Sequence, residues 1–240
     1  MIFDSSMGTA RNRFAHAGGI IREAYESSDL ATGEQVTPTD LVEAIGQLLE
    51  ILERNPADDP MPPMQEEGEA EKVGNHAMNF LHDLGVYSDR LEQPEATAEL
   101  QQVAIAIAMW LASWQKPIQT IDMVVNGLGQ LANQTSDEEE LKRLRDMMQR
   151  VIDHASADIK ADLETTNPYR AWRILLLNAG ITAVRAQDAA GIQQAFDQIQ
   201  QRLPDDAPDF FQEARNQVEQ GDFRPEVVET VRTYAGAGGH

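Results

Sequence analysis

The chain has 240 residues, 42% of them hydrophobic and 25% charged, which is enough apolar sequence to bury the core of one large domain or two modest ones. Its 40 acidic residues outnumber its 19 basic residues, and the formal charge of −21 repels phosphate backbones and anionic lipid, so we expect neither nucleic acid nor a membrane surface as a partner. No cysteine is present, which excludes disulfides, thiolate metal sites and cysteine nucleophiles.

Residues 1–36 are rich in Gly, Ser and Thr and predict an N-terminal arm that is partly irregular. The sequence allows one short helix around Phe14 and Tyr25, and we expect Gly18-Gly19 to interrupt it. The arm lacks a basic start followed by a continuous apolar stretch, so it does not resemble a secretory signal. The longest apolar run, Val103 to Trp114, is shorter than the roughly 20 residues that span a bilayer. These features predict a soluble, cytoplasmic protein.

Residues 37–54 have the pattern of an amphipathic docking helix. Thr37 supplies a hydroxyl cap, Pro38 fits the first turn, and Asp40 lies near the positive end of the helix dipole. Apolar residues then recur at three- and four-residue steps and predict one buried stripe, formed by Leu41, Ile45, Leu48, Leu49 and Leu52.

Residues 55–68 follow as a segment rich in proline and acidic residues. No regular helix or strand accommodates so many prolines in so short a space, namely Pro56, Pro60, Pro62 and Pro63. The sequence therefore predicts a linker or an extended strap.

Residues 69–166 are expected to form a central helical core. A first helix spans about residues 69–84, and Pro94 opens the next. The segment Val103–Ala112 of this second helix is apolar all round, and a helix without a polar face is surrounded by other elements. We therefore place it centrally, with Trp110 and Trp114 as large core anchors.

Two further helices complete the predicted core. Lys116-Pro117 breaks the chain, and the apolar positions that follow keep one helical phase, namely Ile118, Ile121, Val125, Leu128 and either Leu131 or Ala132. Ser136 and Glu139 form a capping-box pattern, which predicts the start of the next helix. Its solvated face carries favourable pairs four residues apart, namely Glu138 with Lys142, Glu139 with Arg143, and Asp146 with Arg150.

Residues 167–240 continue the helical pattern. Pro168 begins a long helix, and three shorter helices are expected at about residues 189–203, 208–220 and 225–235. No run of β-branched residues alternates with polar ones, so we expect no sheet. The predicted architecture is all-α, with eight to ten helices arranged as antiparallel hairpins in a bundle or a short α-solenoid.

The segment FLHDLG, residues 80–85, contains a His82-Asp83 doublet that resembles the centre of the HD-type phosphohydrolases. Those helical enzymes hold one or two divalent metals with His and Asp ligands from several helices. Their pattern includes a further His on an earlier helix and an Asp on a later one. A divergent metal-dependent phosphohydrolase is therefore an alternative function for this chain.

The other histidines do not complete that ligand set. No histidine lies between Thr37 and Asn75, His16 lies in the arm, and His76 faces roughly away from His82 on the same helix. A divalent metal needs several N and O ligands that converge from different elements. We therefore predict no catalytic residue, no metal ligand and no cofactor. His82 and Asp83 are expected to take a capping or surface role near a helix end, followed by Gly85.

Two further patterns imitate functional motifs. Met123 to Ala132 fits G-x-G-x-x-A, the dinucleotide fingerprint, which requires a strand, a tight turn and a helix. Its apolar residues keep one helical phase, so we predict a helix with small residues at a close crossing. His154 and Asp158 are four residues apart and could supply two metal ligands, but no third ligand is evident, which favours a solvated pair.

Residues 173–235 resemble the 34-residue helical hairpins of tetratricopeptide repeats. With Arg173 as the first position, Gly180 falls at the close-packing glycine, Phe196 at the large aromatic of the second helix and Pro204 at the terminating proline. The resemblance implies a stack of helix pairs whose concave side binds a peptide or helix of another protein.

The second repeat frame begins at Ala207 and places Gly221-Asp222-Phe223 at the turn, one period after Asp188. Two positions depart from the pattern, because Ala183 replaces an aromatic residue and Ile192 replaces a small one. Spacing therefore supports the resemblance better than residue identity does.

These observations favour a non-catalytic helical scaffold or adaptor that binds another protein or a second copy of itself. Arg170, Arg173 and Arg185 form the nearest thing to a basic stripe, which could meet an acidic partner, although a solvated helix face is the favoured interpretation. A structural subunit of a larger assembly is a further alternative, in which the arm and the strap contact neighbours. Two explanations of the acidic, lysine-poor composition stay open, namely adaptation to high salt and genomic base composition.

Overall fold

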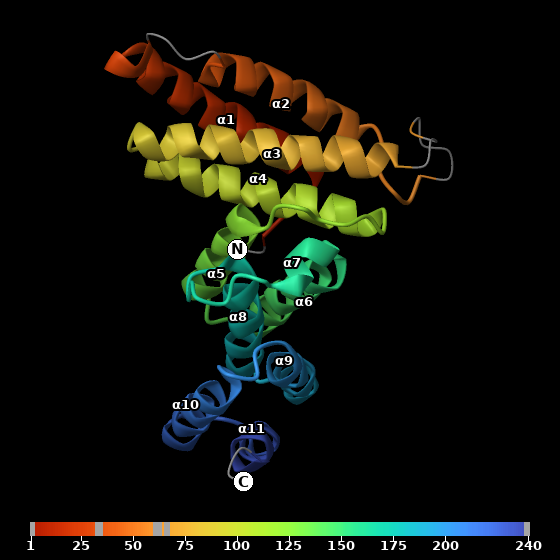
Figure 1. The fold of residues 1–240 in the computed structure, drawn as a ribbon, viewed down its shortest axis with the longest axis vertical. Helices are drawn as coiled ribbons and strands as arrows, with labels where there is room; N and C mark the ends of the chain where they lie inside the picture. Colours follow the sequence, from red (N-terminus) through yellow and green to blue (C-terminus); the bar gives the residue numbers. More distant parts are fainter. Residues whose placement is uncertain (1–2, 32–35, 60–63, 65–67, 238–240) are drawn as a thin grey trace. The chain divides into compact units, whose positions relative to one another are not determined.

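The structure is a computed structural model of the chain and describes residues 3–31, 36–59, 64 and 68–237. These residues form eleven α-helices and one short 3-10 helix (Asp29–Ala31), with no β-strand (Figure 1). The all-α prediction is therefore confirmed. None of the helices in the described part combines the length and apolar character needed to cross a lipid bilayer.

The α-helices, in chain order, are α1 (Met7–Glu26), α2 (Pro38–Glu53), α3 (Glu69–Arg90), α4 (Pro94–Ser113), α5 (Asp122–Gln134), α6 (Glu138–His154), α7 (Ala157–Ala161), α8 (Ala171–Arg185), α9 (Ala189–Arg202), α10 (Ala207–Gln220) and α11 (Pro225–Ala237). Their number within the described residues exceeds the predicted eight to ten because α7, a five-residue helix, forms where the sequence shows only a polar segment.

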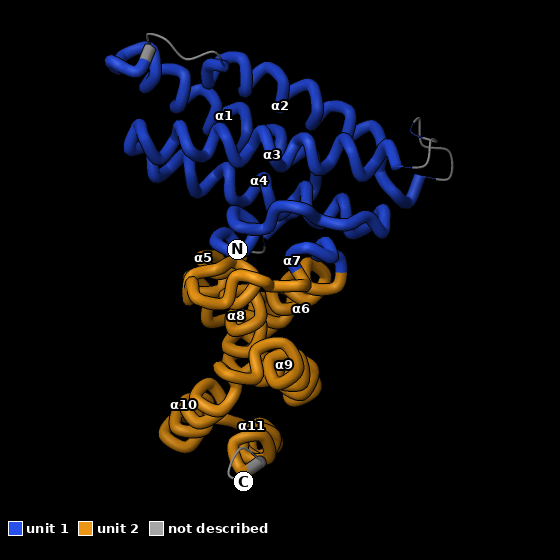
Figure 2. The backbone as a smooth tube through the Cα atoms, viewed as in Figure 1, with its two compact units in different colours: residues 1–127, 154–159 blue, residues 128–153, 160–240 orange. Residues whose placement is uncertain are grey.

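The chain divides into two compact units (Figure 2). Unit 1 comprises residues 1–127 and 154–159, and unit 2 comprises residues 128–153 and 160–240. Each unit has its own core, with Leu81 fully buried in unit 1 and Phe196 in unit 2. The predicted central core, residues 69–166, contributes helices to both units.

Four long helices build unit 1. α1 packs against α2 and α4, α2 packs against α3, and α3 packs against α4 (Figure 1). α4 is the predicted all-apolar helix, and no side chain from Val103 to Ala112 is more than 7% exposed. Burial on every side explains why this helix needs no polar face. The prediction that other elements surround it is confirmed.

Gly18-Gly19 does not interrupt α1, contrary to the prediction. The helix is continuous and buries Phe14 and Tyr25. A Cβ atom at Gly18 would lie 3.0 Å from Cγ1 of Val42 on α2, so glycine permits the close approach of the two helices. Tertiary packing of this kind outweighs the low helix propensity of glycine. The predicted arm therefore contributes a core helix to unit 1.

The predicted cap and stripe of α2 are largely confirmed. Thr37 Oγ1 accepts a hydrogen bond from Asp40 N, and the Asp40 carboxylate accepts one from Thr37 N, which completes a capping box. Four members of the predicted stripe are buried and Leu48 is half-buried.

The predicted strap is anchored to α4 where the structure describes it. The carbonyl oxygen of Asn55 accepts hydrogen bonds from Nε1 of Trp110 at 2.8 Å and of Trp114 at 3.1 Å. Asn55 Oδ1 accepts one from the N–H of Met64 at 2.7 Å, and Met64 itself is buried. Trp110 is buried in the core as predicted, whereas Trp114 is only half-buried and holds the strap from the edge of the core. Three prolines of the strap, Pro60, Pro62 and Pro63, lie outside the described residues.

Unit 2 contains two helical hairpins, α8 with α9 and α10 with α11, and α9 also packs against α11. Gly180 of α8 permits close packing, because a Cβ there would lie 2.9 Å from Ile199 Cδ1 and 2.8 Å from Phe210 Cζ. Phe196 stacks on Phe211 with ring centroids 4.9 Å apart and meets Tyr234 edge-on at 5.3 Å. These aromatic contacts join α9, α10 and α11 into one core.

Helix α6 joins these hairpins through polar contacts. Its cap is Asp137, whose Oδ1 accepts from Glu140 N at 2.8 Å, so the predicted cap at Ser136 is wrong by one residue. Arg145 donates to the Asp188 carboxylate at 2.5 Å, and the two side chains are only 11% and 13% exposed. Glu138, predicted on a solvated face, accepts a hydrogen bond from Gln187 instead.

Candidate functional site: the connector cleft

His82 and Asp83 lie in the middle of α3, so the predicted capping role is wrong. The helix continues through Gly85 to Arg90. Gly85 is buried, and a Cβ there would lie 3.3 Å from Met123 Cε of α5. This glycine therefore lies within α3 at a close contact with another helix and does not end α3. Both His82 and Asp83 are exposed, in agreement with a surface position.

The other candidate ligands do not join them. His16 on α1 and His76 on α3 are exposed. His154 ends α6 and Asp158 belongs to α7, so this pair does not share one helix, contrary to its predicted i, i+4 geometry. Within the residues that the structure describes, no three His, Asp or Glu side chains gather in a group that could hold a metal ion.

The G-x-G-x-x-A segment lies inside α5, without the strand and turn that a dinucleotide site needs. A Cβ at Gly127 would lie 3.1 Å from the carbonyl oxygen of Gln101 on α4. A Cβ at Gly129 would lie 3.0 Å from Nδ2 of Asn178 on α8. The prediction of a helix with small residues at close crossings is confirmed.

The predicted basic stripe is not one solvated face, because its arginines bind other parts of unit 2. Arg185 donates to the carbonyl oxygens of Ala132 at 2.8 Å and Thr135 at 2.7 Å, and so satisfies carbonyl groups at the C-terminal end of α5. The segment between α7 and α8, residues 162–170, is named the connector here. Arg170 is its last residue and binds Asp162 at its start, and Arg173 of α8 binds the carbonyl oxygen of Pro168 within it.

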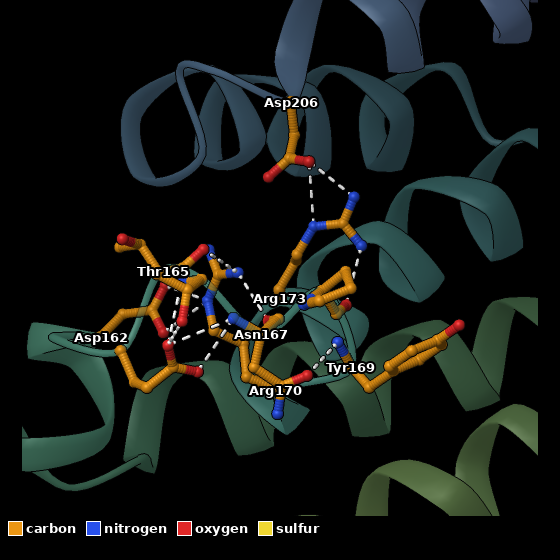
Figure 3. A network of polar contacts seen from close by, with 10 residues as sticks. Asp162, Thr165, Asn167, Tyr169, Arg170, Arg173 and Asp206 are labelled. Carbon is orange, nitrogen blue, oxygen red and sulfur yellow. Dashed lines mark hydrogen bonds and ion pairs between the residues drawn. The ribbon is translucent and has the colours of Figure 1, made fainter.

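The connector forms no helix or strand, yet its own hydrogen bonds define its path (Figure 3). The Glu164 carboxylate accepts from Thr166 N at 2.8 Å and from Asn167 N at 3.0 Å. The hydrogen bond from the Thr166 hydroxyl, together with these two backbone hydrogen bonds, lowers the pKa of Glu164. Asn167 Oδ1 accepts from Tyr169 N at 2.9 Å, which closes a second local turn.

Arg170 closes the connector upon itself. Its Nε donates to both carboxylate oxygens of Asp162, at 2.8 and 2.9 Å, and its Nη1 donates to the carbonyl oxygen of Asn167 at 3.0 Å. Each member of the ion pair is only 14% exposed. A charge-assisted pair with this burial is stronger than an ion pair on an open surface. Figure 3 shows the Arg170 side chain directed back toward Asp162, at the other end of the connector.

Arg173 links the connector to the turn between α9 and α10. Its Nε and Nη2 donate to Oδ1 of Asp206 at 2.9 and 2.5 Å, and its Nη1 donates to the carbonyl oxygen of Pro168 at 3.0 Å (Figure 3). The hydrogen bond from Arg173 lowers the pKa of Asp206, and the charge of Arg170 lowers it further. Both members of the Arg173–Asp206 pair are therefore ionised at neutral pH.

A cleft of about 460 Å³ opens beside these residues, within the size range of ligand sites. We name it the connector cleft. It is formed by the end of α7, the connector, the first turn of α8 and the α9–α10 turn. Its lining residues are Lys160, Ala161, Asp162, Thr165, Thr166, Pro168, Arg170, Arg173, Arg202, Leu203, Pro204, Asp205 and Asp206.

The connector also carries two large side chains that face water. Leu163 is 91% exposed and Tyr169 is 81% exposed. The sequence predicts only a polar break near Thr165-Thr166-Asn167, so the connector and its cleft were missed. The available signal was the presence of two acidic residues shortly before Arg170. Asp162 pairs with the charge of Arg170, and Glu164 accepts hydrogen bonds from the backbone.

Comparisons with protein-family models, curated protein sequences and solved structures gave no match to this chain.

Proposed function

We propose that the chain is a non-catalytic helical scaffold that binds another protein, or a second copy of itself, through unit 2. The observation that carries the proposal is the connector, whose hydrogen bonds define its path while Leu163 and Tyr169 stay almost fully exposed. Holding large side chains in place while they stay exposed to water does not stabilise the isolated chain. Contact with a partner would bury them.

The physical setting favours this use of the connector. Binding residues are commonly carried by loops that a rigid scaffold positions, and tyrosine is enriched among residues that dominate interface energetics. The helical hairpins of unit 2 supply the scaffold. Their resemblance to tetratricopeptide repeats supports the same function, since such hairpins bind peptides and helices of other proteins.

The proposal is tested by site-specific photocrosslinking of the full-length protein in its native cells. A benzophenone amino acid replaces Tyr169 in one variant and Gln201, an exposed residue of α9, in a control variant. We expect one discrete crosslinked species at position 169, absent at position 201 and weakened by Leu163→Ser. Its mass distinguishes a different protein from a second copy. Equal crosslinking at both positions would contradict the proposal.

Metal analysis separates the scaffold from the alternative phosphohydrolase. The purified protein is expected to contain no stoichiometric Mn, Fe or Zn. A stoichiometric metal that disappears in His82→Ala would instead support the hydrolase.

The larger-assembly alternative needs a test that leaves α1 in place. Removing residues 1–36 deletes a helix that buries Phe14, Ile21 and Tyr25, so a lost assembly state would also follow from a damaged core. Light scattering of the intact chain and of Tyr169→Ser avoids this ambiguity. A closed multi-subunit particle that persists in Tyr169→Ser would favour the structural-subunit alternative.

A further inference from the structure

We infer that the connector cleft binds a small oxyanion, a phosphate or carboxylate group. This inference goes beyond the proposed scaffold function and does not depend on it. Four of the chain's 19 basic residues line this one cleft, namely Lys160, Arg170, Arg173 and Arg202. In a chain with a formal charge of −21, such a concentration of cations gives the cleft a local charge opposite to that of the molecule.

The charges inside the cleft do not cancel. Arg170 neutralises Asp162, and Arg173 neutralises Asp206. Two cations, Lys160 and Arg202, then remain against one acidic residue, Asp205. The Lys160 ammonium donates to the carbonyl oxygen of Asp153 at 2.6 Å, a bond that leaves its charge unneutralised. One positive charge is thus in excess among the residues that line the cleft, while the nearby Glu164 carboxylate is held outside the lining by the N–H groups of Thr166 and Asn167.

Unused donors accompany this excess charge. The exposed guanidinium of Arg202 makes no hydrogen bond or ion pair with any residue that the structure describes. Arg170 donates only through Nε and Nη1 to described residues, so Nη2 keeps its two N–H groups. Guanidinium groups match the geometry of phosphate and carboxylate oxygens and bind them through paired hydrogen bonds.

The walls of the cleft are ordered before any ligand arrives. Asp162 and Asp206 fix the planes of Arg170 and Arg173, so little side-chain entropy is lost when an anion binds. The N-cap residues of α8 and α10, Arg170 and Asp206, line the cleft, and neither makes a side-chain capping hydrogen bond. The positive ends of both helices add to the field of the arginines.

The binding test observes the arginine side chains directly. Uniformly ¹⁵N-labelled full-length protein is titrated with inorganic phosphate while the Nε–Hε resonances are recorded, and NaCl at equal ionic strength is the reference. We expect the Arg202 and Arg170 resonances to shift in a saturable way with phosphate and to stay in place with NaCl. Arg202→Gln should weaken phosphate binding about tenfold, the loss of one charge-assisted contact.

Arg232→Gln is the matched control, because Arg232 is also exposed but pairs with Glu219, which does not line the cleft. This variant should change the phosphate affinity less than twofold. Circular dichroism of both variants confirms that each is folded.

A second titration distinguishes the source of the anion. The probe is a capped peptide that contains one phosphoserine, with its unphosphorylated form as the control. Binding of phosphate alone assigns a free anion, and binding of the phosphopeptide, alone or with phosphate, assigns a group carried on a protein. Absence of a saturable Arg202 shift with either probe, or equal weakening by Arg202→Gln and Arg232→Gln, overturns the inference.

Discussion

At Gly74 the absence of a side chain sets the distance between α3 and α4. A Cβ there would lie 2.5 Å from Cδ2 and 2.7 Å from Cγ of Leu111, closer than real Cβ contacts. Gly46 on α2 has no neighbouring atom within 4 Å of its added Cβ. Two helical glycines of unit 1 therefore differ in kind, since only Gly74 is required by packing.

This difference predicts opposite effects of the same substitution. Gly74→Ala should lower the free energy of unfolding by about 1–3 kcal/mol, because α4 must move away. Gly46→Ala should raise it by about 0.5–1 kcal/mol, because alanine loses less backbone entropy in a helix. Urea denaturation measures both. Equal signs for the two variants would contradict the packing of α3 on α4.

A second prediction at the residue scale concerns acid stability. Arg173 lowers the pKa of Asp206 below its ordinary value of 3.8, so the folded state is favoured by the ionised carboxylate. The stabilisation is present above pH 3.8 and is lost as the pH falls through the lower folded-state pKa. Asp206→Asn should therefore be less stable than the wild type at pH 7, with a difference that closes below about pH 4.

Thermal midpoints of the wild type and Asp206→Asn between pH 7 and pH 2 measure this effect. Asp222→Asn, an exposed change outside the cleft, is the control and should track the wild type throughout. A stability difference for Asp206→Asn that stays constant with pH would show that the ion pair does not cause it.

At the scale of elements, Gly180 tests how α8 packs on the next two helices. Leucine at this position would force its side chain into Ile199 of α9 and Phe210 of α10. Gly180→Leu is expected to cost about 1–3 kcal/mol of unfolding free energy through overpacking. Gly236→Leu on α11, where an added Cβ meets nothing within 4 Å, is the matched control. Indistinguishable thermal midpoints for the two variants would contradict this packing.

Helices whose apolar residues keep a steady period were predictable from the sequence. The apolar stripe of α2 and the segment of α4 that is apolar all round identify both helices and their burial. The spacing of apolar side chains indicates which faces of a helix other elements cover. Errors arose where tertiary contacts decide. In the sequence Gly18 is typical of a helix interruption, but in the structure it allows α1 to pack closely on Val42. Gly85 is typical of a helix end, but in the structure it allows α3 to pack closely on Met123.

The connector cleft was out of reach for a related reason. The pair that joins the connector to the α9–α10 turn, Arg173 with Asp206, links residues 33 positions apart in the sequence. Local patterns carry no information on such pairs, since charged residues near helix ends are ordinary. The arginines were noticed as a stripe, and only the three-dimensional arrangement gives each of them a separate partner.

At the scale of the whole molecule, the formal charge of −21 opposes folding through self-repulsion. Acidic residues outnumber basic ones roughly three to one in unit 1 and three to two in unit 2, so unit 1 carries most of the excess. Screening by salt weakens this repulsion over distances beyond about 10 Å at 0.1 M.

The thermal midpoint should therefore rise by several degrees between 20 mM and 0.5 M NaCl at pH 7. Choline chloride should have the same effect, because screening does not depend on the identity of the cation. A rise that continues into the molar range would point to a protein adapted to high salt. A midpoint that is independent of salt would contradict the role assigned to self-repulsion.

The two tryptophans whose indole N–H groups donate to the Asn55 carbonyl oxygen also provide a fluorescent reporter of unit 1. The chain has three tryptophans; Trp110 and Trp114 share this acceptor in unit 1, whereas Trp172 is buried in unit 2. Fluorescence emission of Trp172→Phe consequently arises from unit 1 alone, and its red shift marks the moment when water replaces Asn55. The wild-type spectrum minus that of the variant isolates the signal of Trp172, so each unit can be followed during denaturation without an added dye.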